Sequence, residues 1–159
     1  MPNRIRTSGK YIWGLPNILE RDRHALFFGN RMIRSAIRII QSCLERGVCG
    51  YLEKPLPSLV WGIMNRRFCK EFAAGLCRYV ACDLCQYGTS YKKPTRFMLF
   101  GPNIGGITLR RCSGKHGICS RTGIKHEQIT STHDCNFGVR DGQWSATKTQ
   151  IYQMDLAKI

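Results

Sequence analysis

The periodic spacing of apolar residues stops near Gly101, and this break limits where the chain can build a hydrophobic core. Residues 101–143 are rich in Gly, Ser, Thr, Cys and His and show neither a helical nor a strand period. A segment of that length is normally functional, clamped by a metal or mobile. We therefore expect one α/β domain, whose patterned part is 1–110, with an irregular basic arm at 1–28. An irregular Cys/His-rich region and a terminal helix occupy 111–159.

Helical and strand periods follow one another before the break. The clearest predicted helix spans 31–46, where Asn30 is the N-cap, Gly47 ends the helix, and apolar side chains recur on one face. The residues on that face are Met32, Ile33, Ala36, Ile37, Ile39, Ile40, Cys43 and Leu44. A strand, a helix and two further strands are predicted at 48–52, 58–67, 79–84 and 96–100. The strand at 48–52 has the continuous apolar run of a buried, parallel strand, and the final helix is predicted at 147–159, capped by Ser145.

Positive charge is spread along the whole chain. There are 25 Lys and Arg residues against 10 Asp and Glu residues, which gives a net charge of +15. A field of that size attracts polyanions. Nucleic acid, either DNA or RNA, is therefore the expected partner, and a generally solvated basic surface is the simpler explanation. No apolar stretch is long enough to span a bilayer, so no membrane partner is expected.

The cysteine content points to thiols or metal ligands. The chain has nine cysteines, an odd number. Because no apolar stretch follows Met1, we expect no secretory leader, and hence a reducing, intracellular compartment such as the cytoplasm, nucleus or nucleoid. Disulfides are rare in such compartments.

Cys and His residues gather within the irregular region at spacings that could hold zinc. The predicted ligands are Cys112, Cys119 and His126, with His116 or Cys135 as the fourth. The spacing matches no standard zinc finger, so a basic loop with incidental Cys and His is the alternative. The pair Cys82-x-x-Cys85 is left out of the site, since Cys82 belongs to a predicted strand and no second pair follows at the spacing of a zinc ribbon.

Two motifs place polar side chains where predicted strands end. Glu53 follows the first strand, at the edge where open α/β sheets bind ligands, although a Glu there is often an ordinary surface acid. The second motif runs from the Tyr87-Gly88 turn, where Gly88 is expected to allow a positive φ, through a basic loop to Arg96. Charge interleaved with aromatic residues suits a phosphate backbone and an exposed base. The predicted nucleic-acid-binding residues are Lys54, Tyr87, Lys92, Lys93 and Arg96.

In this order, the two motifs resemble the cytosine-5 DNA methyltransferase family, most closely its divergent branch in phages, viruses and mobile elements. Glu53 matches the Glu of that family's Glu-Asn-Pro motif, and Tyr87-Gly88 followed by Lys93-Pro94-Thr95-Arg96 matches its later basic segment. The resemblance covers most of the chain. It implies a partial Rossmann-like methyltransferase sheet with helices. It also implies that Glu53 binds the edge of a flipped cytosine and that Arg96 belongs to the inherited catalytic site.

The chain departs from this family at the parts that carry the chemistry. It has no Pro-Cys dipeptide to supply the nucleophile, no Gly-rich turn for S-adenosylmethionine, and Lys54 where the motif has Asn. We therefore expect a truncated, methyltransferase-like, nucleic-acid-binding protein that does not methylate alone and has no cofactor apart from zinc. One alternative is half of a split methyltransferase, completed by a second chain that supplies the S-adenosylmethionine site. Another is a small basic protein, stabilised by zinc and without enzymatic activity, that binds nucleic acid or another partner.

Overall fold

The computed structural model describes residues 6, 7 and 9–128, which form a mixed α/β structure. The predicted terminal helix at 147–159, its cap Ser145 and the candidate ligand Cys135 lie outside these residues. The chain divides into two compact units. Unit 1 contains the described residues up to Val80 together with Arg96–Thr108, and unit 2 contains Ala81–Thr95 together with the described residues from Leu109 onward. We describe each unit by itself.

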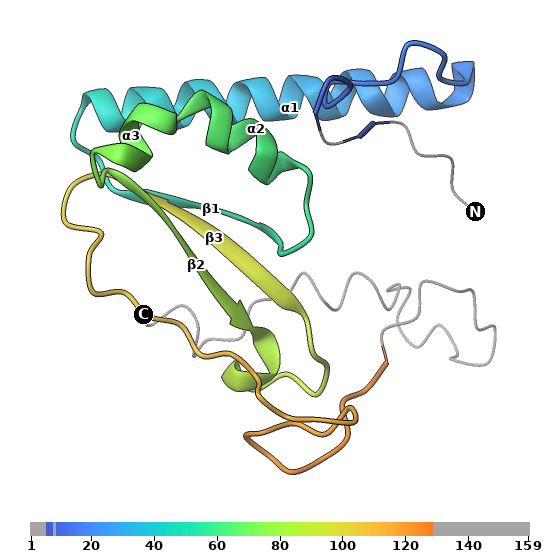
Figure 1. The fold of residues 1–159 in the computed structure, drawn as a ribbon, viewed down its shortest axis with the longest axis vertical. Helices are drawn as coiled ribbons and strands as arrows, with labels where there is room; N and C mark the ends of the chain where they lie inside the picture. The colour runs from blue at the N-terminus through green and yellow to red at the C-terminus, as the bar shows by residue number, and fades with distance from the viewer. Residues whose placement is uncertain (1–5, 8, 129–159) are drawn as a thin grey trace, which may run out of the picture. The chain divides into compact units, whose positions relative to one another are not determined.

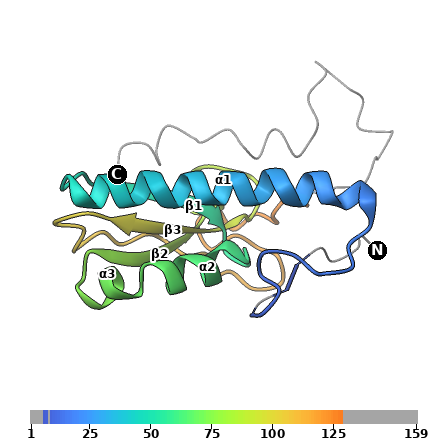
Figure 2. The same ribbon diagram turned by 90° about the horizontal axis from the view of Figure 1, so that it is seen from above.

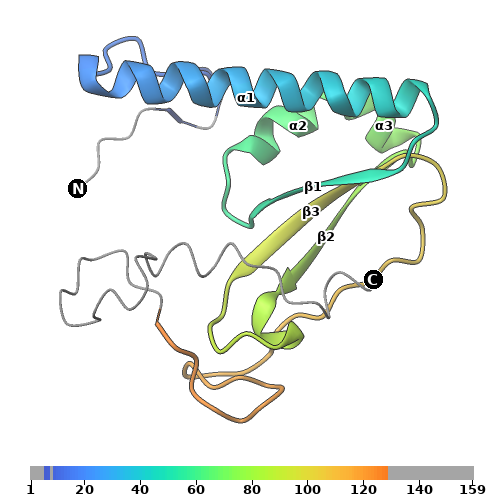
Figure 3. The same cartoon turned by 180° about the vertical axis from the view of Figure 1, so that it is seen from behind.

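The sheet has three strands, β1 (Gly50–Pro55), β2 (Cys77–Asp83) and β3 (Pro94–Phe100), in the order β1-β3-β2. Neighbouring strands are antiparallel, as Figures 1 and 3 show. Because β3 runs between β1 and β2 in the opposite direction, β1 and β2 point the same way without pairing. The prediction of strands within residues 79–84 and 96–100 is confirmed, whereas a Rossmann-like sheet is not.

The predicted strand at 48–52 differs from β1 in both position and burial. Strand β1 begins at Gly50 and continues to Pro55, so Glu53 lies within the strand rather than after it. Val48 is 49% exposed and Tyr51 is 68% exposed. The prediction of a buried, parallel strand is therefore wrong: β1 pairs only with β3 among the described strands, and an edge strand of an antiparallel sheet can leave one face open.

Helix α1 (Glu20–Glu45) is eleven residues longer at its start than the sequence pattern predicts. Asn30 is not its N-cap but a mid-helix residue, whose Nδ2 donates a hydrogen bond to the carbonyl oxygen of Trp13 at 2.7 Å. Acidic residues in the first turn, Glu20 and Asp22, favour the true start through the helix dipole. The prediction of an irregular arm at 1–28 is therefore wrong for residues 20–28, which belong to α1.

The remaining part of the arm packs on α1. Gly14 has a φ of 139°, and a Cβ at this position would lie 2.4 Å from a side-chain carbon of Leu26 in α1. Only glycine allows both this backbone conformation and this close approach. The neighbouring Ile12 is 4% exposed and belongs to the main core of unit 1.

Helices α1, α2 (Val60–Arg67) and α3 (Cys69–Ala73) cover one face of the sheet, as Figures 1 and 2 show. They bury a shared apolar cluster between the helices and the strands. Its buried members are Ile12, Ile37, Ile40, Trp61, Ile63, Met64, Phe68, Cys77, Met98 and Phe100. Full burial of one large apolar side chain stabilises a fold by about 1.5–3 kcal/mol, so this cluster is the main source of stability in unit 1.

Helix α1 also exposes apolar side chains away from this core. Met32 is 69% exposed and Ile39 is 62% exposed, although the helical pattern places them on the predicted apolar face. The face that is buried is narrower and centres on Ile37 and Ile40. Among the described residues, no helix combines the length and apolar character needed to cross a bilayer.

Candidate metal centre

The first part of the site lies directly after β2, in unit 2. A short 3-10 helix, η1 (Leu84–Tyr87), follows Asp83 and ends at Gly88, which has a φ of 104°. This left-handed conformation was expected from the sequence, because glycine adopts it without steric cost. Cys85 lies within η1 and is fully buried.

A small hairpin brings two further metal-binding side chains together. Ile118 and Lys125 form an antiparallel bridge. The backbone N–H of Cys119 donates to the carbonyl oxygen of Ile124 at 2.8 Å, and that of His126 donates to the carbonyl oxygen of Gly117 at 2.7 Å. These bonds place Cys119 and His126 near the two ends of one tight turn.

The buried carboxylate of Asp83 positions the fourth residue of the site, Cys112, through its backbone N–H. Asp83 is fully buried, and its Oδ2 accepts hydrogen bonds of 2.8 Å from the backbone N–H of Cys112 and from Nε of Arg111. The ion pair with Arg111 compensates the burial of the Asp83 charge, since an unpaired buried carboxylate would be strongly unfavourable. Asp83 thereby ties Cys112 to the end of β2, two residues before Cys85.

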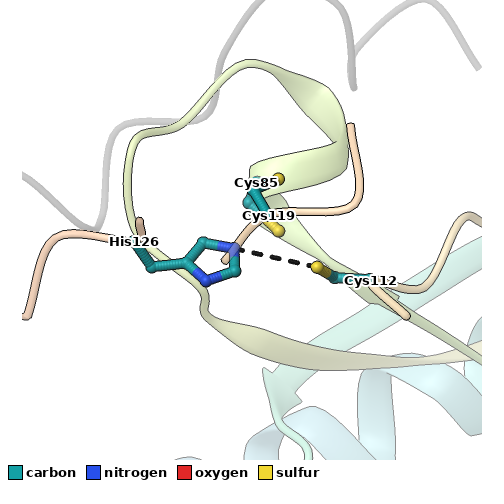
Figure 4. Close-up of side chains that lie close together, drawn as sticks. All are labelled: Cys85, Cys112, Cys119 and His126. Carbon is teal, nitrogen blue, oxygen red and sulfur yellow. Dashed lines mark hydrogen bonds between the residues drawn. The ribbon is translucent and has the colours of Figure 1, made fainter. Parts of the chain in front are cut away.

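The four side chains converge on one point (Figure 4). The Sγ atoms of Cys85, Cys112 and Cys119 and a ring nitrogen of His126 all lie within 4.8 Å of one another. In a tetrahedral zinc site with Zn–S bonds of about 2.3 Å, neighbouring sulfurs are about 3.8 Å apart. The distance of 3.7 Å between Cys112 Sγ and His126 Nε2 already matches such an edge. The other ligand atoms need only a small contraction to surround a metal ion.

Polar groups around the cluster point at the sulfur atoms. Nε2 of Gln86 lies 3.7 Å from the Sγ atoms of both Cys85 and Cys119. The backbone N–H and the hydroxyl of Ser120 donate to Sγ of Cys112 at 3.4 and 3.5 Å. Hydrogen bonds of this kind orient ligands and stabilise thiolates around a bound metal.

The thiols of the cluster differ in acidity. Burial raises the pKa of Cys112, but hydrogen bonds led by those from Ser120 outweigh it and lower the pKa to about 6. For Cys119, burial is likewise outweighed by bonds from Arg121, Thr122 and His126, and the pKa is about 7. Burial raises the pKa of Cys85 to about 12. Cys112 and Cys119 are therefore readily available as thiolates near neutral pH, whereas Cys85 would have to release its proton to solvent in order to bind a metal.

The structure brings the three predicted ligands Cys112, Cys119 and His126 together, and it adds Cys85 as the fourth. His116 is exposed, with a φ of 52°, and is not part of the cluster. Sequence reasoning missed Cys85 because it judged the two cysteines of Cys82-x-x-Cys85 as a pair. Cys82 is indeed buried in β2, but the chain turns into η1 after Asp83 and presents Cys85 to the other side chains.

Glu53 and Arg96, the catalytic residues that the methyltransferase resemblance implies, lie in unit 1 on two faces of the sheet. Arg96 stacks over Trp61 and Tyr79 on the helix-covered face, 5.8 and 5.2 Å from the ring centroids. Tyr51 contacts Phe97 on the other face. Because side chains alternate along a strand, Glu53 lies with Tyr51, opposite to Arg96. One carboxylate oxygen of Glu53 is buried without a hydrogen-bond partner among the described residues.

The predicted nucleic-acid-binding residues also differ in accessibility. Lys54 is exposed in β1, and Lys92 is exposed in the loop after Gly88. Lys93 is half-buried, and its carbonyl oxygen accepts a bond from Leu84 N–H. Tyr87 is only 9% exposed, and its hydroxyl accepts a bond from Arg110 N–H at 2.9 Å. Its buried ring is therefore not placed to stack on a base.

No family model, no curated protein and no solved structure matches this chain. The chemistry of the four side chains therefore carries the functional argument.

Proposed function

We propose that this protein is a zinc-stabilised, nucleic-acid-binding protein. The observation that carries the proposal is the convergence of Cys85, Cys112, Cys119 and His126. Three thiolates and one imidazole form a standard donor set for structural zinc, and four protein ligands leave no open position for catalysis. Soft thiolate ligands also disfavour magnesium and calcium.

Unit 2 needs such a clamp because its own apolar core is small. Apart from cysteines, its buried hydrophobic residues within the described range are Leu84 and Tyr87. The segment 109–128 has no helix or strand apart from two isolated bridges, one between Ile118 and Lys125 and one between Tyr91 and Glu127. A metal that joins η1, Cys112 and the hairpin replaces the contacts that a larger core would supply.

Charge supports nucleic acid as the partner. The described part of unit 2 has seven Lys and Arg residues and two Asp and Glu residues. One of the two acids, Asp83, is fully buried and paired, whereas six of the seven basic residues are exposed. The exposed basic residues are Lys92, Arg110, Arg111, Lys115, Arg121 and Lys125. This surface suits a polyanion with closely spaced phosphates.

The order of the Glu53 motif and the Tyr87-Gly88 motif along the chain favours a second candidate, the truncated methyltransferase-like protein expected from the sequence. The opposite orientations of Glu53 and Arg96 argue against an inherited catalytic pair. This candidate therefore also predicts nucleic-acid binding without methyl transfer by the chain alone, and a second chain with S-adenosylmethionine would be needed for activity.

The experiment combines metal analysis with binding measurements. Protein purified without added chelator is analysed for zinc, and its affinity for fluorescently labelled duplex and single-stranded DNA and RNA is measured by anisotropy across a salt series. We expect about one zinc per chain and an affinity that falls steeply with salt, with a slope on duplex DNA of about −0.9 for each phosphate contacted. Absence of binding at low salt to all of these probes would refute the proposed function.

A further inference from the structure

Three exposed basic side chains of unit 2 are hydrogen-bonded to the segments that carry the metal ligands. Nε of Arg121 donates to the carbonyl oxygen of Cys85 at 2.7 Å. Nζ of Lys92 donates to the carbonyl oxygen of Cys112 at 3.4 Å. Their positions therefore depend on two of the four ligands.

Arg111 is fixed in the same way through a carboxylate. Its Nε donates to Oδ2 of Asp83, the same oxygen that accepts the backbone N–H of Cys112. The side chain of Arg111 is still 47% exposed. Arg111, like Lys92, is thus held beside Cys112, and Arg121 is held beside Cys85, whose Sγ lies within 4.8 Å of that of Cys112.

The hydrogen bonds that fix these side chains leave their outward donors for a ligand. Arg111 and Arg121 each use Nε, and within the described residues their terminal Nη groups make no hydrogen bond. The two Nη groups of a guanidinium can bind a phosphate through two parallel hydrogen bonds, and a lysine ammonium has three donors. Cations that are already immobilised lose less conformational entropy when they bind.

We propose that Lys92, Arg111 and Arg121 form a phosphate-binding surface for nucleic acid, and that the metal centre sets the spacing of these three cations. This inference rests on the proposed function and adds which surface contacts the nucleic acid and how metal occupancy regulates that contact. Loss of the metal leaves η1, Cys112 and the hairpin joined by hydrogen bonds alone, so the spacing of the three cations is no longer fixed. Nucleic-acid affinity then depends on metal occupancy, and a chelator or a thiol oxidant that removes zinc weakens binding.

Charge alone predicts a different result. A zinc ion with three thiolates has a net charge of −1, and the metal-free cluster differs from it by at most two charges whatever its thiols carry, whereas the chain has a net charge of +15. The long-range field of the protein therefore changes little when the metal leaves. A large loss of affinity on metal removal would reflect lost geometry rather than lost charge.

The same three cations have a competing explanation, in which they only balance the negative charge of the thiolate cluster. A matched pair of variants separates the two roles. The first combines Lys92→Gln and Arg121→Gln, and it keeps Arg111 because Arg111 pairs with the buried Asp83. The control combines Arg21→Gln and Arg38→Gln, which removes the same charge from helix α1. The control residues are exposed and make no hydrogen bond or ion pair among the described residues.

Zinc content, affinity for a labelled 20-base-pair DNA duplex and the salt slope are measured for both variants. We expect both to retain one zinc, and the unit 2 variant to lose at least tenfold more affinity than the control. Its salt slope should also fall by about 2, as expected for about two lost phosphate contacts. Equal losses in the two variants would overturn the inference and leave a diffuse basic surface. Loss of zinc from the unit 2 variant would assign the cations to charge balance and also overturn it.

A second experiment tests whether nucleic-acid affinity depends on the bound zinc. Zinc is removed from the wild-type protein with a chelator under reducing conditions, and the metal-free protein is titrated with the same duplex before and after zinc is restored. We expect at least tenfold weaker binding that zinc restores. Unchanged affinity without zinc would overturn the metal dependence, while the proposed function fails only if the zinc-loaded protein does not bind any nucleic acid.

Discussion

Unit 1 and unit 2 differ in the side chains that can stabilise them. Unit 1 buries a large apolar cluster between three helices and the sheet. Unit 2 buries Cys85, Cys112 and Cys119 together, with His126 beside them, as a group that could hold a metal ion. The difference teaches that hydrophobic periodicity identifies only the first kind of region, since a metal clamp requires a few ligands and no period.

Loss of a ligand should give the largest effect and should be confined to unit 2. Cys119→Ser removes one of the four ligands, and we expect metal affinity to fall by several orders of magnitude. Structural zinc sites contribute about 10–16 kcal/mol of apparent binding free energy in small domains. Amide NMR spectra should show collapse of signals from residues 109–128. The control is Cys69→Ser, an exposed cysteine in α3, which should keep both metal and spectrum. If Cys119→Ser keeps full zinc affinity, Cys119 is not a zinc ligand.

A substitution in the apolar core of unit 1 should lower the free energy of unfolding without changing the zinc content. Met64 is fully buried in α2, and Met64→Ala leaves a cavity that should cost about 2–5 kcal/mol of unfolding free energy. We expect a lower denaturant midpoint for the helical signal with unchanged zinc content, measured by circular dichroism and metal analysis. Met32→Ala in the exposed part of α1 should change the midpoint little. A loss of zinc from Met64→Ala would contradict the idea that the apolar core of unit 1 and the metal centre of unit 2 stabilise the protein independently.

The pH dependence of zinc affinity should reflect the different pKa values of the three thiols. Metal binding requires thiolates, so each protonated ligand releases a proton and affinity rises with pH. At pH 8 only Cys85, with a pKa of about 12, is still protonated, whereas below pH 6 all three thiols are. The logarithm of affinity should therefore rise about one unit per pH unit near pH 8 and up to about three below pH 6. A competition titration with a zinc-binding dye checks this, and an affinity independent of pH would contradict thiolate ligation.

A smaller effect is expected from the carboxylate that holds Cys112. Asp83→Asn removes the charge that pairs with Arg111 but keeps an oxygen that can accept the Cys112 N–H. We expect a 10- to 100-fold loss of zinc affinity, the usual range for residues that orient metal ligands. Thr89→Ser changes another buried polar residue of unit 2 conservatively and serves as the control. The same dye competition measures both, and an unchanged zinc affinity in Asp83→Asn would show that Asp83 does not position the site.

The sequence predicts local structure well where a residue's own chemistry decides the conformation. Gly88 adopts the expected positive φ, and the strands around 77–83 and 94–100 are close to the predicted ones. The early start of α1 was missed because Gly29 and Asn30 are typical of helix ends, whereas contacts with the packed arm near Trp13 stabilise the helix there. Strand direction was also missed, since a short apolar run does not encode its partner.

The candidate site shows the same limit. Three ligands lie within fifteen residues and were predicted from their spacing, whereas Cys85 is 27 residues before Cys112 in the sequence and reaches it only through the turn after β2. A ligand supplied by tertiary structure leaves no spacing signal in one sequence. Asp83 is similar: nothing in the sequence distinguishes it as the acceptor for Cys112 N–H.

X-ray absorption spectroscopy at the zinc edge tests the central claim most directly. The account predicts one zinc per chain with three sulfur neighbours at about 2.3 Å and one nitrogen neighbour at about 2.0–2.1 Å. It also predicts that Cys85→Ser changes the first shell to two sulfurs or abolishes binding. A shell dominated by oxygen, or an unchanged three-sulfur shell in Cys85→Ser, would contradict the proposed metal centre.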